Sequence, residues 1–181
     1  SGKLTVDSIG TNTLTNQGVV VNTADKKEAA GSADFESDEA DFLSVADASL
    51  AEKFPFKASD TAKNITVCAW VKLESLPKYY DLYTICGKWS EQANQRSLRL
   101  YATNLPTGCR FSMSVGYLSG HAADSFELST LDVQPGRWYH VVAVARPAGD
   151  GMPTGILAVY LNGRRVGETP FDGTVRNVAH E

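Results

Sequence analysis

The sequence predicts an all-β protein in which two antiparallel sheets pack face to face as a β-sandwich. Most of the longer segments alternate between apolar and polar residues with a period of two, and turn residues separate them at short intervals. A strand with one face in a core produces this alternation, and many short strands with regular turns are typical of a sandwich or barrel. In segment 64–73 the apolar set is Ile65, Val67, Ala69, Val71 and Leu73.

Further segments extend this pattern along the chain. Three alternate as the first does: 82–89, 96–103 and 109–116. Segment 137–146 is apolar at nearly every position, which predicts a central strand covered on both faces. Shorter strands are expected at 18–22, 32–36 and 41–45. One short turn of helix is expected within segment 47–54, with Asp47 or Ser49 as its cap.

A tight hairpin is expected near the end of the chain. Segment 155–162 leads through Asn162-Gly163 into segment 164–168. Asn-Gly tolerates positive φ at both turn positions, so this dipeptide favours a two-residue turn between two strands.

The composition of the 181 residues excludes several classes of protein. Apolar residues make up 43%, so a folded domain with a core is expected rather than disorder. Lys and Arg total 17 against 21 Asp and Glu, and this net charge of −4 without a basic block argues against a nucleic-acid binder. No stretch approaches the ~20 apolar residues of a membrane span, so no membrane insertion is expected. No repeat or linker divides the chain, so one domain is expected over residues 1–181.

The three cysteines, Cys68, Cys86 and Cys109, have apolar neighbours and are too few for a disulfide framework. We expect three buried free thiols. A Cys68–Cys86 bridge is the alternative, since their two segments could be neighbours in a sheet. No Cys or His spacing suggests zinc.

Several motifs follow one another in a set order along most of the chain. They are Ala33-Asp34-Phe35-Glu36-Ser37-Asp38, Asp41-Phe42-Leu43-Ser44-Val45-Ala46-Asp47, Ile65-Thr66-Val67-Cys68-Ala69-Trp70-Val71-Lys72, Ile85-Cys86-Gly87-Lys88-Trp89, Pro135-Gly136-Arg137-Trp138-Tyr139-His140-Val141-Val142-Ala143-Val144 and Leu157-Ala158-Val159-Tyr160-Leu161-Asn162-Gly163-Arg164. Together they resemble the laminin G-like, concanavalin A-like jelly rolls. Segment 12–18 also resembles the usual N-terminal segment of that family.

The resemblance implies a two-sheet antiparallel jelly roll that is missing its C-terminal strands. The family normally continues past the position of Val178 with two more strands, whereas this chain stops at Glu181. We expect a fragment of a longer protein. The alternatives are that a partner supplies the strands, because exposed edges invite pairing, or that the fold closes differently.

No group of residues predicts catalysis, so we do not expect an enzyme. The related fold also hosts glucan hydrolases, which need two carboxylates aimed into one cleft. The nearest match is the acidic run 36–39, where polar residues and an expected turn indicate a solvated loop. Of the histidines His121, His140 and His180, the second lies inside a strand and is expected to be a hydrogen-bonded structural residue.

A binding site is easier to support than a catalytic one. Sugars bind where an aromatic ring stacks on the apolar face of the pyranose and polar side chains bond its hydroxyls. Arg99 and Tyr101 share one strand face, and Trp89 ends the strand before. The candidate ligand-binding residues are Trp89, Arg99, Tyr101, Arg110, His121 and Asp124. The alternative is that the two rings only pack within the fold and that Arg99 is a solubilising surface residue.

Calcium is the other common feature that the resemblance brings. It would need several carboxylate and carbonyl oxygens, and isolated loop aspartates are usually turn formers or caps. The loop acids are Asp81, Asp124, Asp150 and Asp172. Their spacing matches no known loop, so no metal ligand and no cofactor is predicted.

The resemblance implies a non-catalytic recognition module of a larger bacterial or phage-like protein. Its expected partner is a glycan or surface polysaccharide, and its expected place is outside the cell or on a cell or virion surface. A second hypothesis is a structural or protein-interaction domain that pairs with another chain at an open sheet edge. The third, a glycan hydrolase, is disfavoured because no acid pair is evident.

Overall fold

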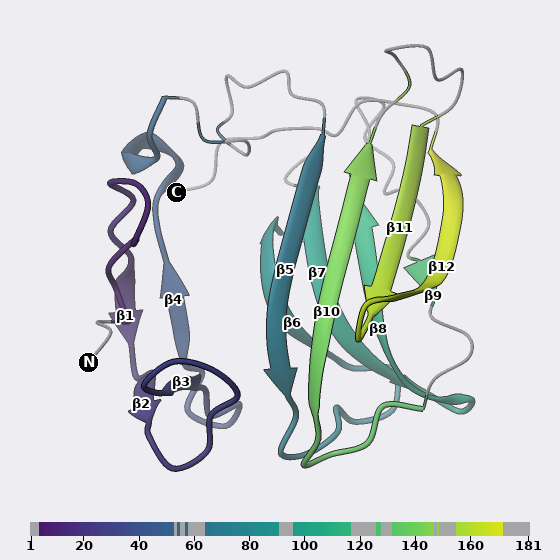
Figure 1. The fold of residues 1–181 in the computed structure, drawn as a ribbon, viewed down its shortest axis with the longest axis horizontal. Coiled ribbons are helices and arrows are strands. Elements are labelled where there is room, and N and C mark those ends of the chain that lie inside the picture. The colour runs from purple at the N-terminus through teal and green to yellow at the C-terminus, as the bar shows by residue number, and fades with distance from the viewer. Residues whose placement is uncertain are drawn as a thin grey trace. The chain divides into compact units, whose positions relative to one another are not determined.

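The computed structural model describes residues 4–52, 54, 57, 64–90, 96–116, 126–127, 132–146, 148 and 155–171. The chain divides into two compact units, residues 1–57 with 179–181 and residues 58–178 (Figure 1). The single domain expected over residues 1–181 stays a prediction.

The first unit contains short strands in two antiparallel pairs. Strand β1 (Thr15–Gln17) pairs with β4 (Phe42–Ser44), and β2 (Val20–Asn22) pairs with β3 (Ser32–Asp34). The strands expected within 18–22, 32–36 and 41–45 are therefore confirmed.

A 3-10 helix, η1 (Asp47–Ser49), forms where one helical turn was expected. Its N-cap residue is Ala46, and no side chain caps it. The prediction of Asp47 or Ser49 as the cap is therefore wrong. The turn is held instead by backbone bonds, from Ser49 N–H to the Ala46 carbonyl at 2.9 Å and from Leu50 N–H to the Asp47 carbonyl at 3.1 Å.

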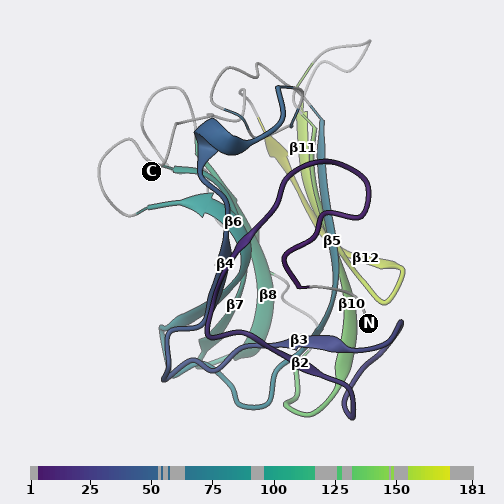
Figure 2. The ribbon, with the colours of Figure 1, turned by 90° about the vertical axis from the view of Figure 1, so that its left-hand side faces the viewer.

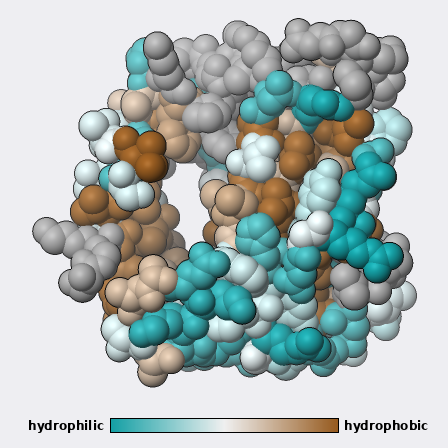
Figure 3. Space-filling model, in the orientation of Figure 1, coloured by the Kyte–Doolittle hydropathy of each residue, from teal (hydrophilic) through white to brown (hydrophobic). Residues whose placement is uncertain are grey.

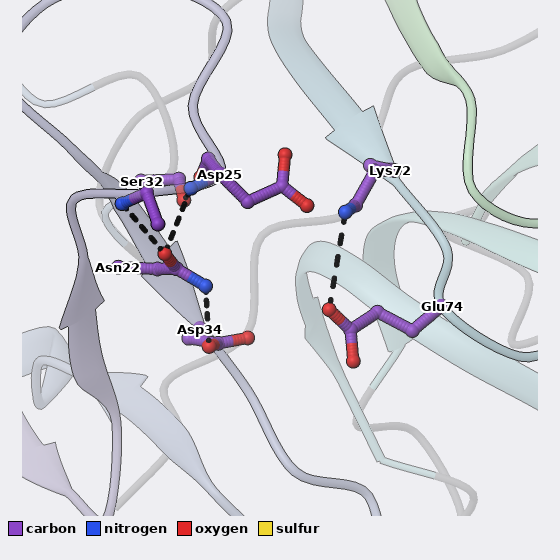
Figure 4. Close-up of polar contacts among 7 residues, drawn as sticks. Asn22, Asp25, Ser32, Asp34, Lys72 and Glu74 are labelled. Atoms are coloured by element: carbon purple, nitrogen blue, oxygen red, sulfur yellow. Dashed lines mark hydrogen bonds and ion pairs between the residues drawn. The ribbon is translucent and has the colours of Figure 1, made fainter.

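Short polar side chains fix the loops of the first unit. The Asn22 Nδ2 donates to the Asp34 carboxylate at 3.1 Å, and the Asn22 Oδ1 accepts from the Asp25 N–H at 2.9 Å (Figure 4). The Asp7 carboxylate accepts from the backbone N–H groups of Gly10 and Ile9 and from Asn12. These hydrogen bonds favour the ionised form and lower the pKa of Asp7 from 3.8 to about 2.

The second unit is a sandwich of two four-stranded antiparallel sheets. One sheet has the order β12 (Arg164–Phe171), β11 (Gly155–Leu161), β10 (Trp138–Arg146) and β5 (Ile65–Lys72). The other has the order β6 (Leu82–Trp89), β7 (Arg96–Leu105), β8 (Gly108–Val115) and β9 (Phe126–Glu127). The two layers are visible in Figures 1 and 2. The all-β, two-sheet antiparallel fold predicted from the sequence is confirmed.

Apolar side chains from both sheets form the core. Phe111 of β8 meets Tyr139 of β10 edge-on, with ring centroids 5.7 Å apart. The alternation of the sequence decides which residues enter this core, because successive side chains of a strand point to opposite faces. The buried set includes Leu98, Leu100, Ala102, Phe111, Met113, Val115, Tyr139, Val141, Ala143, Ala145, Leu157, Val159 and Leu161.

Strand β10 is central in its sheet, as expected, but it is fully covered on one face only. Tyr139, Val141, Ala143 and Ala145 are buried, whereas the residues between them are half-buried. The prediction of cover on both faces is therefore wrong. The outer residues pack against neighbours in the same sheet, for example His140 against Trp70 with centroids 5.0 Å apart. Apolar residues gather over the upper part of this face in Figure 3.

The Asn162-Gly163 hairpin is confirmed. Asn162 and Gly163 have φ values of 51° and 79°, as the tight turn requires. Asn162 also binds the backbone of His140, accepting from its N–H through Oδ1 at 2.9 Å and donating its own N–H to the carbonyl at 2.8 Å. The turn therefore fixes the register of β11 against β10.

All three cysteines are free, but only Cys109 is buried, and burial raises the pKa of its thiol. Cys68 and Cys86 are exposed, which corrects the expectation of three buried thiols. They lie on β5 and β6, which belong to different sheets, so the alternative of a bridge between sheet neighbours is wrong. Within the part of the chain that the structure describes, no helix has the length and apolar character needed to span a membrane.

Candidate functional site

Strand β7 has one apolar and one polar face, and the polar face carries most of the candidate binding residues. In register, Arg99 pairs with Ser114 of β8, Tyr101 with Ser112, and Thr103 with Arg110. These side chains alternate with the core residues of the same two strands. We call this side of the two strands the polar face, defined by Arg99, Tyr101, Thr103, Arg110, Ser112 and Ser114, of which Tyr101, Arg110, Ser112 and Ser114 are buried.

Arg99 lies close to two aromatic rings at the edge of the polar face. Its Cζ is 4.7 Å from the centroid of the Trp89 ring and 4.6 Å from that of Tyr101. Both distances lie within the range of a cation–π interaction. The planar guanidinium is therefore held in one orientation, with donors in a rigid fork suited to paired oxygen acceptors. The three residues that the sequence singled out first are thus brought together.

Arg96 also lies beside the cluster of Trp89, Arg99 and Tyr101, although the sequence did not predict it. Its Cζ lies 5.8 Å from the Trp89 ring centroid. Residues 96 and 99 should point to opposite faces of a regular strand, because the side-chain period is two. A register shift between Lys88 and Trp89 changes the pairing, so that Trp89 lies opposite Arg96. Sequence periodicity gives no sign of such a shift.

Gly87 makes room for Arg99 on the neighbouring strand. The two residues pair directly in register. A Cβ at position 87 would lie 2.8 Å from the Leu98 carbonyl oxygen and 3.1 Å from the Arg99 Cα. Backbone atoms cannot move aside at low cost, so glycine allows β6 and β7 to approach at this point.

The Tyr101 ring packs against Arg99 and is too buried to contact a ligand directly. Its side chain is only 6% exposed, and its hydroxyl accepts a hydrogen bond from the Ser114 Oγ at 3.3 Å. A pyranose could not stack on a ring so enclosed. The hydroxyl of the neighbouring Ser112 is buried and has no hydrogen-bond partner among the described residues. The polar face therefore contains buried polar groups behind its aromatic edge.

The other candidate residues do not join the cluster. Arg110 is 6% exposed and donates from Nη2 to the Thr107 hydroxyl, at the hairpin between β7 and β8. His121 and Asp124 lie outside the described residues. Trp89, Arg99 and Tyr101 are thus the part of the candidate set whose mutual contacts the structure describes.

The acidic candidates occupy exposed turns. Glu36, Asp38 and Glu39 are all exposed, in keeping with the solvated loop expected there. Asp81 is exposed, and its Oδ1 accepts from the Leu82 N–H at 2.8 Å, which is the behaviour of a cap. The remaining loop acids, Asp124, Asp150 and Asp172, lie outside the described residues.

Comparison with known proteins identifies one family. The family model described as "Concanavalin A-like lectin/glucanases superfamily" matches residues 46–180. Searches of curated proteins and of solved structures return no match. The matched residues include η1 and every strand of the second unit.

Proposed function

The chain belongs to the concanavalin A-like lectin/glucanase superfamily, and we propose that it is a non-catalytic module that binds glycans. The family supports a lectin-like or interaction module in general terms. The proposal is narrower. It names a glycan or surface polysaccharide as the partner and places the module outside the cell, on a cell surface or on a virion, as part of a larger protein.

The observation that carries the proposal is the fixed position of Arg99 between Trp89 and Tyr101. A guanidinium held by two rings has a fixed orientation, so little conformational entropy is left for it to lose on binding. Adjacent hydroxyls of a sugar offer acceptors with matching spacing. Trp89 beside it is half-buried. Such a pair combines an apolar wall with oriented polar donors, as small-ligand sites generally do.

The acidic residues favour binding over hydrolysis. Retaining glycosidases place two carboxyl groups about 5 Å apart on either side of the scissile bond. The acidic run proposed from the sequence, 36–39, lies on an exposed turn of the first unit. A general acid must be held within hydrogen-bond reach of the scissile oxygen, and an exposed turn is a poor support for that geometry.

A glycan array tests the proposal with conservative substitutions. Wild-type protein is expected to bind a subset of glycans, and Arg99→Lys to weaken that binding about tenfold or more, because hydrogen bonds to a charged group are worth roughly 1.5–3 kcal/mol. Tyr101→Phe keeps the ring under Arg99 and is expected to retain most of the binding, whereas Tyr101→Ala is expected to lose it. Arg164→Lys, on the exposed β11–β12 hairpin, is the matched control.

Two results would contradict the proposal. Absence of binding by the wild-type protein across the array would remove the glycan as partner. Equal binding by wild type, Arg99→Lys and Tyr101→Ala would remove this site.

A second candidate function is assembly through sheet edges. β5 and β12 are the outer strands of their four-stranded sheet, and no other strand among the described residues pairs with the outer edge of β5. An exposed edge presents unpaired N–H and C=O groups that a strand of another chain can bond. Light scattering after size exclusion is expected to show a concentration-dependent dimer if this function holds. A strict monomer over a wide concentration range would speak against it.

A further inference from the structure

Two adjacent tyrosines stand out on the loop between β5 and β6. Tyr79 and Tyr80 are 69% and 76% exposed, and they are the most exposed aromatic side chains among the described residues. They occupy the centre of a turn that is closed by a hydrogen bond from the Asp81 N–H to the Lys78 carbonyl at 2.9 Å. Large rings seldom project into water without a partner, whereas single scattered apolar residues are common.

The backbone of this turn is fixed to β7. The Tyr80 N–H donates to the Asn104 carbonyl at 2.8 Å, and the Asn104 Nδ2 donates to the Pro77 carbonyl at 2.9 Å. The Thr103 hydroxyl also donates to the Asp81 carbonyl at 3.0 Å. The rings are therefore exposed on a rigid support, not on a loose loop. A rigid support reduces the entropy lost when a ligand binds.

Tyr80 adopts a backbone conformation that disfavours its own side chain. Its φ is 65°, in the left-handed region where a bulky residue is an outlier. Glycine or asparagine would adopt this φ at lower cost, so the turn does not explain a tyrosine at this position. Strained residues of this kind concentrate at binding sites, where the side chain has a use that offsets the strain.

The surroundings of the two rings select the class of partner. Lys78 and Asp81 are exposed on either side of the pair, and Thr103 and Asn104 lie beside it on β7. The core of a protein interface is a contiguous apolar patch with few charges. A pyranose instead offers a small C–H face surrounded by hydroxyls. Two rings set among charged and polar groups match the sugar better than they match a protein core.

We propose that Tyr79 and Tyr80 form an aromatic platform on which the sugar rings of an oligosaccharide stack, with Lys78 and Asp81 bonding the hydroxyls. This platform rests on the proposed glycan-binding function and lies on the loop between β5 and β6, whereas Trp89 and Arg99 lie on strands β6 and β7. It adds a binding surface that the sequence motifs did not indicate.

The test uses the full chain on an array of immobilised cello-, laminari-, chito- and manno-oligosaccharides. Each ring is expected to contribute roughly two- to tenfold in affinity, so the double variant Tyr79→Ala/Tyr80→Ala should lose roughly four- to hundredfold. Tyr79→Phe keeps a ring and should keep the binding. Phe35→Ala removes an exposed ring from the first unit and is the matched control.

Tyr80→Gly separates a binding role from a structural one. It removes the ring but suits the positive φ, so the melting temperature should not fall while the affinity does. A melting temperature well below that of the wild type would show that the Tyr80 side chain is structural and would overturn the proposal.

The remaining outcomes separate this proposal from the broader one. If the wild-type protein binds no oligosaccharide, both fail. If the wild type binds and the double variant binds equally well, only the platform is refuted. If the double variant keeps its glycan binding but loses a dimer seen by light scattering, the pair belongs to a protein interface and the platform is again refuted.

Discussion

Replacing Phe111 by alanine is expected to lower the free energy of unfolding by about 3–5 kcal/mol. Phe111 is fully buried, and its ring reaches across from β8 to contact Tyr139 of β10 edge-on. Its removal takes away apolar contacts and leaves a cavity between two sheets that cannot close over it. Urea unfolding followed by circular dichroism measures the change, and the slope of the transition should stay the same.

Tyr139→Phe provides the control for this expectation. It keeps the ring that meets Phe111 and removes only the hydroxyl, which accepts from the Gln134 N–H at 3.0 Å. The expected loss is about 0.5–1.5 kcal/mol, the usual net value of one hydrogen bond. A smaller loss for Phe111→Ala than for Tyr139→Phe would contradict a core in which these two rings join the sheets.

Gly116→Ala is expected to destabilise the protein by about 3 kcal/mol, the upper end of the usual cost of overpacking. A Cβ at this position would lie 2.1 Å from the Arg96 carbonyl oxygen and 2.8 Å from the carbonyl carbon. The Gly116 N–H also donates to the Ser97 carbonyl at 2.8 Å, so the backbone is held in place. Relief of the clash therefore requires β7 and β8 to separate near Arg96, and the same unfolding experiment measures the cost.

Gly136→Ala separates the clash from the effect of backbone conformation. Gly136 has a φ of 74°, and a Cβ there would meet nothing within 4 Å. Its expected cost is about 1–2 kcal/mol, from the left-handed conformation alone. Equal losses for the two alanine variants would mean that the approach of Gly116 to Arg96 has no energetic consequence.

The long strands could be predicted from the sequence because each has enough residues to show its period. The segment expected at 82–89 coincides with β6, and the other long segments differ from their strands by a few residues. β1 and β9 were not predicted, and β9, with two residues, is too short to display an alternation. Such short strands exist through their partners, β4 and β8.

Sheet membership could not be read from alternation either. The period of a strand indicates its two faces but not its neighbours in the sheet. Alternation alone therefore leaves a bridge between Cys68 and Cys86 open. Likewise, the apolar residues on both faces of β10 indicated a central strand, which is correct. They could not show that one face lacks a second layer of cover.

The candidate site was predictable to the extent that it depends on alternation. Arg99 and Tyr101 share a face for that reason, and Trp89 ends the strand before them. The position of Arg96 beside Trp89 depends on a register shift, and the burial of Tyr101 depends on the packing over the polar face. Neither can be predicted from the sequence pattern. Tyr79 and Tyr80 are visible in the sequence as adjacent aromatic residues after Pro77, but the alternation of the strands gives no interpretation of such a pair in a loop.

Strand β7 has a consequence for how this protein can diversify. Leu98, Leu100 and Ala102 hold the two layers together, while Arg99 and Tyr101 between them face the other way. Selection for a new ligand can therefore exchange half-buried residues of the polar face, such as Arg99, while the core residues between them preserve the scaffold. Antibody loops change their specificity partly through variation in length. In this strand, single substitutions at a constant length can change the ligand that is bound.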